Sequence, residues 1–211
     1  MEKKLSVLDS LGWGLAIVVT HIVSFALPTF IFLAILAIVH GVFFNELSLI
    51  PYSFYFIDGI LLTAMNLYFI QLSLAFYDQK VDSTQVLFSS ILRLPRVIIT
   101  DFLYTIIVVI GFVLLIIPGF FWHVRFAFFP AFIVDQNRGI IQSLRESYRL
   151  TKGCFWRLWF LFLLLSPSLW LAGSTLMKEN FLYFFMVTSF LFTPIYAAAT
   201  VHVYRSMLGE K

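Results

Sequence analysis

The sequence predicts an all-α bundle of transmembrane helices, and composition, apolar patterning and charge placement each indicate this class. Of the 211 residues, 61% are apolar and only 12% are charged, whereas a soluble domain is about half apolar and about a quarter charged. So few charged side chains cannot cover the surface of a soluble globule of this length. Composition therefore excludes a soluble domain, a disordered chain and a disulfide scaffold. It indicates a polytopic membrane protein whose apolar surface faces lipid.

Six apolar stretches are expected to cross the hydrocarbon core as helices, because a backbone in lipid must satisfy its own hydrogen bonds. The first, residues 11–44, exceeds the roughly 20 residues that a crossing needs, so we expect either a kink at Pro28 or a tilted helix. The third is expected to stop and turn at Pro118-Gly119. The fourth is the shortest and contains a charged residue, Arg125. The second to sixth spans are predicted over residues 59–77, 97–117, 120–134, 158–177 and 181–204.

Basic side chains predict the orientation of these spans. If the N-terminus is cytoplasmic, that side receives twelve of the fourteen Lys and Arg residues, as the positive-inside rule requires. Lys178 alone falls outside. An odd number of crossings would place Arg205 and Lys211 outside, so the pattern favours six. The first apolar stretch is too long for a cleaved signal peptide and lacks a small-residue cleavage site. We therefore expect a retained first helix and both termini in the cytoplasm.

We expect a single integral membrane domain over residues 1–211 that contains a tandem repeat. Two connecting segments, DQKVDSTQVLFSS (78–90) and DQNRGIIQSLRES (135–147), share five identities at a spacing of 57 residues. The identical pairs are Asp78/Asp135, Gln79/Gln136, Gln85/Gln142, Leu87/Leu144 and Ser90/Ser147. The predicted repeat units cover about residues 58–117 and 118–177, flanked by the helices 11–44 and 181–204. Such repeats are common in transporters, but duplication also produces them in proteins that carry nothing.

Both connecting segments are predicted to be amphipathic helices on the cytoplasmic membrane surface. In the first, Asp82 with Gln85 is expected to cap the start. In the second, the apolar face is expected to comprise Ile140, Ile141, Leu144 and Tyr148. The opposite face carries the interfacial basic residues Arg145, Arg149 and Lys152, together with Gln142 and Glu146. These cations suit membrane lipids with anionic headgroups as partners. The alternative, which we favour, is ordinary positive-inside bias without a specific lipid site.

Arg125 is the clearest candidate site residue, because a charge in the middle of an apolar span is costly. One interpretation is that Arg125 faces the bundle interior or an aqueous cavity and binds an anionic group, such as a lipid phosphate or a carboxylate. The other, slightly favoured, is structural. It is either a buried pair with Asp101 or Asp58, or capping of the broken backbone near Pro118 and Pro130.

Asp101 and His123 are the other ionisable candidates within the spans. Asp101 lies about one turn inside the cytoplasmic arginines, so a local ion pair is favoured over a coupling-ion site. Its candidate partners are Arg96, Arg93 and Arg157. His123 is two residues from Arg125 and therefore not on the same helical face. We expect it to pack or hydrogen-bond near the outer interface rather than to relay protons.

Enzyme signatures do not occur in the sequence. It has no G-x-S-x-G, no Walker-type loop and no cluster of carboxylates on one helical face. No histidine pair has the spacing of a metal site, and the single cysteine, Cys154, has no cysteine partner. The net charge of +3 is accounted for by topology and does not indicate nucleic acid. We therefore expect no enzymatic activity, no cofactor and no metal.

The central segment, IPGFFWHVRFAFFPAFIVDQNRGIIQSLRESYRLTKGCFWRL, carries a recognisable pattern. Its elements are Pro118-Gly119, Pro130, Val134-Asp135, Ser143, the run Ser147-Tyr148-Arg149-Leu150-Thr151, and Gly153. The segment resembles a group of uncharacterised bacterial membrane proteins. That group includes the YciC-like inner-membrane proteins and the membrane domain attached to some glycerophosphoryl diester phosphodiesterases. The resemblance covers mainly residues 78–165. It implies a six-helix bundle in a bacterial cytoplasmic (inner) membrane with no established reaction, and no phosphodiesterase, because this chain has no room for that catalytic barrel.

Three functions follow as hypotheses. The favoured one is a non-enzymatic integral membrane protein associated with the cell envelope, with lipid or protein partners. The second is a small transporter or lipid-handling protein that uses Arg125. The third, a membrane-embedded enzyme, ranks last because no catalytic constellation occurs in the sequence.

Overall fold

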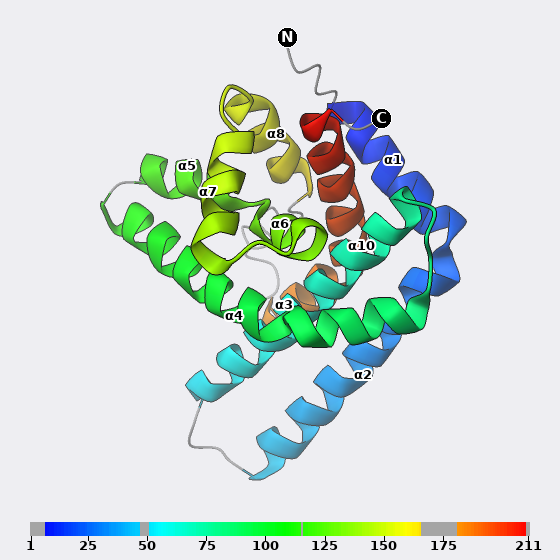
Figure 1. Cartoon of the computed structure of the whole chain (residues 1–211). Coiled ribbons are helices and arrows are strands. Elements are labelled where there is room, and N and C mark those ends of the chain that lie inside the picture. Colours follow the sequence, from blue (N-terminus) through cyan, green and yellow to red (C-terminus); the bar gives the residue numbers. More distant parts are fainter. Residues whose placement is uncertain (1–6, 47–50, 115, 166–180, 210–211) are drawn as a thin grey trace.

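The computed structural model describes residues 7–46, 51–114, 116–165 and 181–209, which form helices joined by short turns (Figure 1). No strand occurs in these ranges, which confirms the all-helical class. In chain order the helices are α1 (Val7–Thr20), α2 (Ile22–Glu46), α3 (Pro51–Tyr77), α4 (Ser83–Leu114), α5 (Ile116–Phe126), α6 (Phe129–Gln136), α7 (Ile140–Leu150), α8 (Phe155–Leu165) and α10 (Phe181–Leu208).

Helix α3 is the centre of the fold. Helices α2, α4, α6 and α10 all pack against it. The second half of α3 is almost entirely buried, and Met65, Phe69 and Leu72 are completely inaccessible. A helix buried on all sides must be apolar all round, and the sequence of α3 between Gly59 and Tyr77 is nearly so. The central position of α3 brings its C-terminal end close to α6 and α10.

The first apolar stretch is broken into two helices at His21, not at Pro28. Segments Leu8–Thr20 and Ile22–Ile35 meet at 83°, whereas Pro28 lies inside the continuous helix α2. The two halves differ in their main partner, because α1 packs mainly on α10, whereas α2 packs on α3 and also contacts α10. At the break, the His21 ring stacks on Phe76 of α3 with 4.1 Å between ring centroids. Packing partners therefore set the position of this bend.

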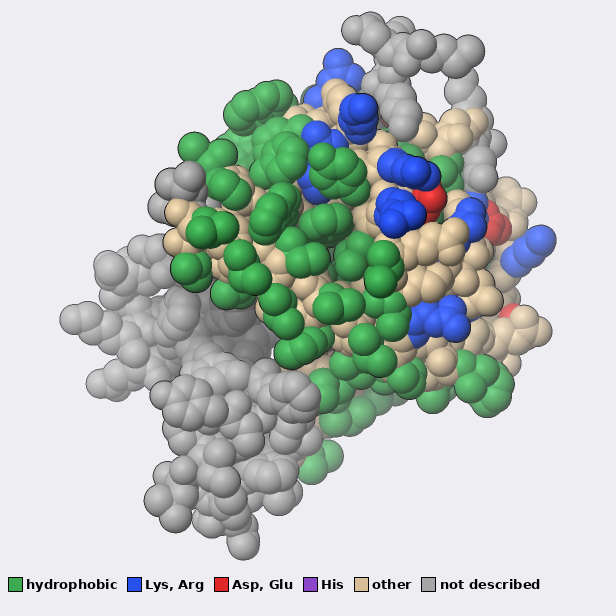
Figure 2. Space-filling view, turned by 60° about the vertical axis from the view of Figure 1, so that its left-hand side comes forward, with side chains coloured by type: hydrophobic (Ala, Val, Ile, Leu, Met, Phe, Trp, Pro, Cys, Tyr) green, Lys and Arg blue, Asp and Glu red, His purple; other side chains and the backbone are tan. Residues whose placement is uncertain are grey.

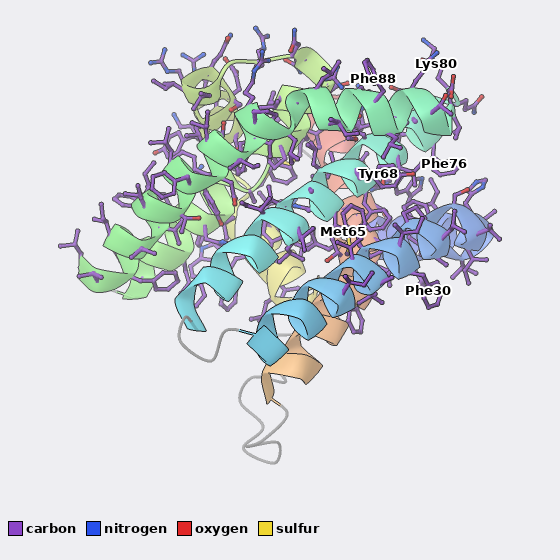
Figure 3. The ribbon with its side chains drawn as sticks, turned by 90° about the horizontal axis from the view of Figure 1, so that it is seen from below. Phe30, Met65, Tyr68, Phe76, Lys80 and Phe88 are labelled. Atoms are coloured by element: carbon purple, nitrogen blue, oxygen red, sulfur yellow. The ribbon has the colours of Figure 1, made fainter. Side chains whose placement is uncertain are left out.

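Helix α4 combines the first connecting segment and the third predicted span in one continuous helix. Asp82 caps its start as expected, since its carboxylate accepts hydrogen bonds from the backbone N–H groups of Thr84 (3.0 Å) and Gln85 (3.3 Å). The Thr84 hydroxyl also donates to it at 2.7 Å, and these bonds hold the pKa of Asp82 below its usual range. Figure 3 shows that α4 changes direction part-way along, beyond Phe88. Pro95 lies inside the helix and supplies the usual cause of such a bend.

The fourth predicted span consists of α5 and α6, with a break between Phe126 and Phe129. Pro118 and Gly119 lie in the first turn of α5 and therefore do not form the expected stop and turn. Proline is tolerated in a first turn because its missing N–H has no helical acceptor there. A Cβ atom on Gly119 would lie 2.5 Å from the Phe112 ring, so glycine at this position permits the close contact of α5 with α4.

Length and composition identify three helices able to cross a membrane within the described ranges. These are Gly59–Tyr77, Thr84–Leu114 and Ile117–Gln136, and the bent α1–α2 pair makes a fourth if it counts as one span. Helix α8 occupies the start of the fifth predicted span, whose residues 166–177 lie outside the described ranges. Helix α10 covers the sixth. The structure thus agrees with a membrane protein, while six crossings and the tandem repeat remain predictions.

Candidate functional site

Arg125 lies near the end of α5, with its guanidinium between two aromatic rings. Its Cζ atom is 4.7 Å from the centroid of the Phe121 ring and 5.0 Å from that of the Tyr148 ring of α7. Both distances are within the range of cation–π attraction. Its Nε and Nη1 atoms are buried and donate no hydrogen bond within the described part of the chain. The aromatic rings therefore hold the charge of Arg125, while its in-plane donors are left without an acceptor.

The backbone of Arg125 takes part in a different interaction, at the break between α5 and α6. The Ser147 hydroxyl donates to the Arg125 carbonyl at 2.9 Å and accepts from the Phe128 N–H at 3.1 Å. The Thr151 hydroxyl lies 3.4 Å from the same carbonyl. A helix break frees backbone groups that need new partners when they are buried. Ser147 supplies them, so the capping of this break comes from α7 and not from the Arg125 side chain.

Asp101 and Arg125 are not brought together by the fold. Asp101, on α4, accepts a hydrogen bond of 3.2 Å from the Thr63 hydroxyl of α3, and among the described residues no ion pair joins it to Arg125. Arg96 donates instead to the Asn137 side chain at 2.7 Å. The side chain of Asp58, the other candidate partner of Arg125, lies outside the described residues.

His123 is positioned by α4 rather than by Arg125. Its Nδ1 atom is hydrogen-bonded to the Tyr104 hydroxyl, and its ring also contacts Phe162 of α8 edge-on, with 6.2 Å between centroids. His123 therefore lies in a hydrogen-bonded and aromatic setting between α4, α5 and α8.

Two of the interfacial basic residues, Arg145 and Arg149, lie on the exposed side of α7, and the third, Lys152, lies in the turn that follows it. Arg145, Arg149 and Lys152 are all exposed, and Arg149 lies 3.5 Å from Glu146 in an exposed ion pair. The buried side of α7 comprises Ser143, Leu144, Ser147 and Leu150. Figure 2 shows Lys and Arg side chains grouped beside an extensive hydrophobic surface.

The faces of α7 differ in part from the expected division. Ile141 and Tyr148, expected on an apolar face with Leu144, are exposed on the same side as Arg145 and Lys152. The reason is that the serines at positions 143 and 147 pack inward, where their hydroxyl groups bond to backbone carbonyls. The exposed face of α7 is therefore both basic and apolar.

A second charged cluster, not expected from the sequence, lies where α3, α6 and α10 meet. Nη2 of Arg205 lies 2.8 Å from a carboxylate oxygen of Asp78 and 2.9 Å from one of Asp135. The Tyr204 hydroxyl donates to Asp135 at 2.9 Å and accepts from the Gln136 amide at 3.1 Å. The Arg205 side chain is only 8% exposed. The sequence identifies Arg205 only as part of the positive-inside pattern, and the recurrence of Asp at positions 78 and 135 is the signal that could predict a shared partner.

No group of three His, Cys, Asp or Glu side chains in the described ranges could hold a metal ion. Residues 42–205 match the model of an uncharacterised protein family, UPF0259. No solved structure matches the chain.

Proposed function

The chain belongs to the Uncharacterised protein family (UPF0259), and from this premise we propose that it is a non-enzymatic, multi-pass protein of a bacterial cytoplasmic membrane, associated with the cell envelope. The proposal rests on the exposed face of α7, which is both basic and apolar. The helices next to α7 also have an exposed apolar surface. On α4 that surface includes Phe102, Ile106, Val109 and Val113. Exposed apolar side chains in such number are stable when they face lipid.

The proposed topology has six crossings with both termini in the cytoplasm. The distribution of basic residues supports it, because this topology puts twelve of the fourteen Lys and Arg residues on one side, and Lys and Arg are concentrated on the cytoplasmic side of membranes. The resemblance of residues 78–165 to YciC-like proteins supports a location in a bacterial inner membrane. Anionic headgroups are the proposed partners, because a basic surface next to a membrane attracts them.

The tandem repeat forms part of the proposal and has support in the ends of two helices. The Lys80 N–H donates to the Ala75 carbonyl at the end of α3, and the Asn137 N–H donates to the Phe132 carbonyl at the end of α6. Donors and acceptors are both 57 positions apart, which is the spacing of the sequence identities. Asp78 and Asp135, paired at the same spacing, both contact Arg205.

Thiol labelling tests the topology. In a Cys154→Ala background, a membrane-impermeant maleimide is added to intact spheroplasts carrying Ser48→Cys, Ser174→Cys or Lys80→Cys. We expect labelling at positions 48 and 174, and labelling at position 80 only after the membrane is opened. Labelling of position 80 in intact cells would contradict the proposed topology.

A second candidate function, a small transporter or lipid-handling protein, is favoured by one observation on Arg125. Its guanidinium has two buried donors without acceptors and no ion pair among the described residues. A structural arginine within an apolar span is expected to have a carboxylate or carbonyl partner. A guanidinium without one is suited to receive an anionic ligand, and the experiment of the next subsection tests this function.

A further inference from the structure

We propose that Arg125, Arg145 and Lys152 form a binding site around Tyr148 for the phosphate group of an anionic membrane lipid. The inference rests on the second candidate function above and names its ligand class. The ligand chemistry is a phosphate ester, and the source to which we assign it is the headgroup of a membrane lipid.

The surroundings of the Arg125 guanidinium support a phosphate as its ligand. The Cζ atom of Arg125 lies over the rings of Phe121 and Tyr148, and these rings accept none of its N–H groups as a carbonyl or carboxylate would. Its donors Nε and Nη1 are buried and have no acceptor in the described part of the chain. Phosphate oxygens approach a guanidinium in its plane and accept from adjacent N–H groups. A phosphate is therefore the kind of ligand that these donors lack.

The basic residues near Tyr148 also favour an anionic ligand. Arg145 lies three positions before Tyr148 on α7, and such positions neighbour one another on a helix surface, whereas Lys152 lies in the turn that follows α7. Both side chains are exposed. Tyr148 itself contacts the Arg125 guanidinium. The one acidic residue of α7, Glu146, is the ion-pair partner of Arg149. One cation therefore contacts the Tyr148 ring and two more lie close to Tyr148 in the sequence, and repulsion among such charges falls when an anion binds near them.

Exposed apolar and aromatic side chains on α7 and α8 indicate the source of the phosphate. Ile141 and Trp156 are exposed on α7 and α8, and the Phe121 ring packs on Phe155 with 5.2 Å between centroids. Exposed tryptophan with exposed aliphatic residues is typical of the headgroup level of a bilayer. A phosphate bound at Tyr148 is thus adjacent to surface that suits lipid chains, which favours a lipid over a soluble phosphate ester.

Native mass spectrometry of the full-length protein in detergent tests the site. Phosphatidylglycerol and phosphatidylcholine with identical acyl chains are titrated against wild type, Arg125→Gln and Arg149→Gln. Arg149→Gln removes the same charge from an exposed position, already paired with Glu146, and is the matched control. We expect Arg125→Gln to weaken phosphatidylglycerol binding about tenfold and Arg149→Gln to leave it within about twofold.

Equal losses in the two variants would overturn the proposal, because they would indicate general surface charge. Undiminished binding by Arg125→Gln would overturn it as well. If Arg125→Gln does not fold, the double variant Arg145→Gln/Lys152→Gln decides, since both positions are exposed, and the same tenfold loss is expected. Inorganic phosphate and glycerol 3-phosphate are added as competitors, and displacement of the lipid at matched concentration would contradict the lipid source. Failure of this site with the thiol-labelling pattern intact would leave the proposed membrane topology standing.

Discussion

Arg205 donates a hydrogen bond of 2.9 Å to the carboxylate of Asp135, although 70 positions of sequence separate the two residues. The same nitrogen donates to Asp78 at 2.8 Å, so one buried cation connects α10 to the ends of α3 and α6. Both carboxylates lie at helix C-termini, where a negative charge is unfavourable. Arg205 offsets this effect and fixes the two helix ends relative to α10.

Replacement of Arg205 by glutamine is expected to be strongly destabilising. The substitution leaves two carboxylates close together without their cation, a change that costs about 3–5 kcal/mol for a buried network. Denaturant unfolding of the detergent-solubilised protein measures the change. Arg149→Gln is the control: its side chain is 67% exposed, and breaking such a pair costs no more than about 1 kcal/mol. Equal stability of the two variants would contradict the role of Arg205.

The two carboxylates of this network are expected to differ in importance. The Asp135 side chain is 17% exposed and that of Asp78 is 42% exposed, and only Asp135 also accepts from the Tyr204 hydroxyl. Asp135→Asn should therefore lower the unfolding free energy more than Asp78→Asn, because solvent screens the more exposed pair. The same unfolding assay ranks the variants, and the reverse order would show that exposure does not determine their contributions.

Ser147→Ala is expected to destabilise the break between α5 and α6. The substitution removes the partner of the Phe128 N–H and the nearer of the two hydroxyl partners of the Arg125 carbonyl, and an unsatisfied buried group costs about 1–3 kcal/mol. Ser143→Ala is a matched control, because Ser143 is equally buried but bonds to the Ile140 carbonyl within its own helix. We expect a clearly smaller loss for Ser143→Ala in thermal unfolding. Comparable losses would contradict the prediction that the Ser147 hydrogen bonds across the break stabilise the protein more than the Ser143 bond within α7.

The first turn of α4 is expected to loosen in acid. The bonds from Thr84 and Gln85 lower the pKa of Asp82 in the folded chain, so the carboxylate stabilises this turn above its unfolded pKa of about 4. That stabilisation is lost as the pH falls through the lowered folded pKa. Hydrogen exchange at the start of α4, corrected for the intrinsic rate, should show less protection at low pH in wild type. Asp82→Asn should remove the pH dependence, and a variant with the same pH dependence as wild type would rule out Asp82 as its origin.

The helical class, the Asp82 cap and the exposed basic residues of α7 could be predicted because they depend on local pattern. Apolar runs, a capping carboxylate and helical spacing are all visible within a few residues. The bend at His21 could not be predicted, since it depends on which helices α1 and α2 pack against. The roles of Ser147 and Arg205 also depend on contacts between distant segments. Hydroxyl groups that pack inward likewise changed the faces of α7, where hydrophobicity alone predicted Tyr148 and Leu144 together.

The central claim is that the basic face of α7 lies on the cytoplasmic side of a membrane. Gln142 is exposed on that face, so Gln142→Cys in a Cys154→Ala background reports its side directly. With a membrane-impermeant maleimide, we predict no labelling in intact spheroplasts and full labelling in inside-out vesicles. Labelling of Gln142→Cys in intact spheroplasts would contradict the account.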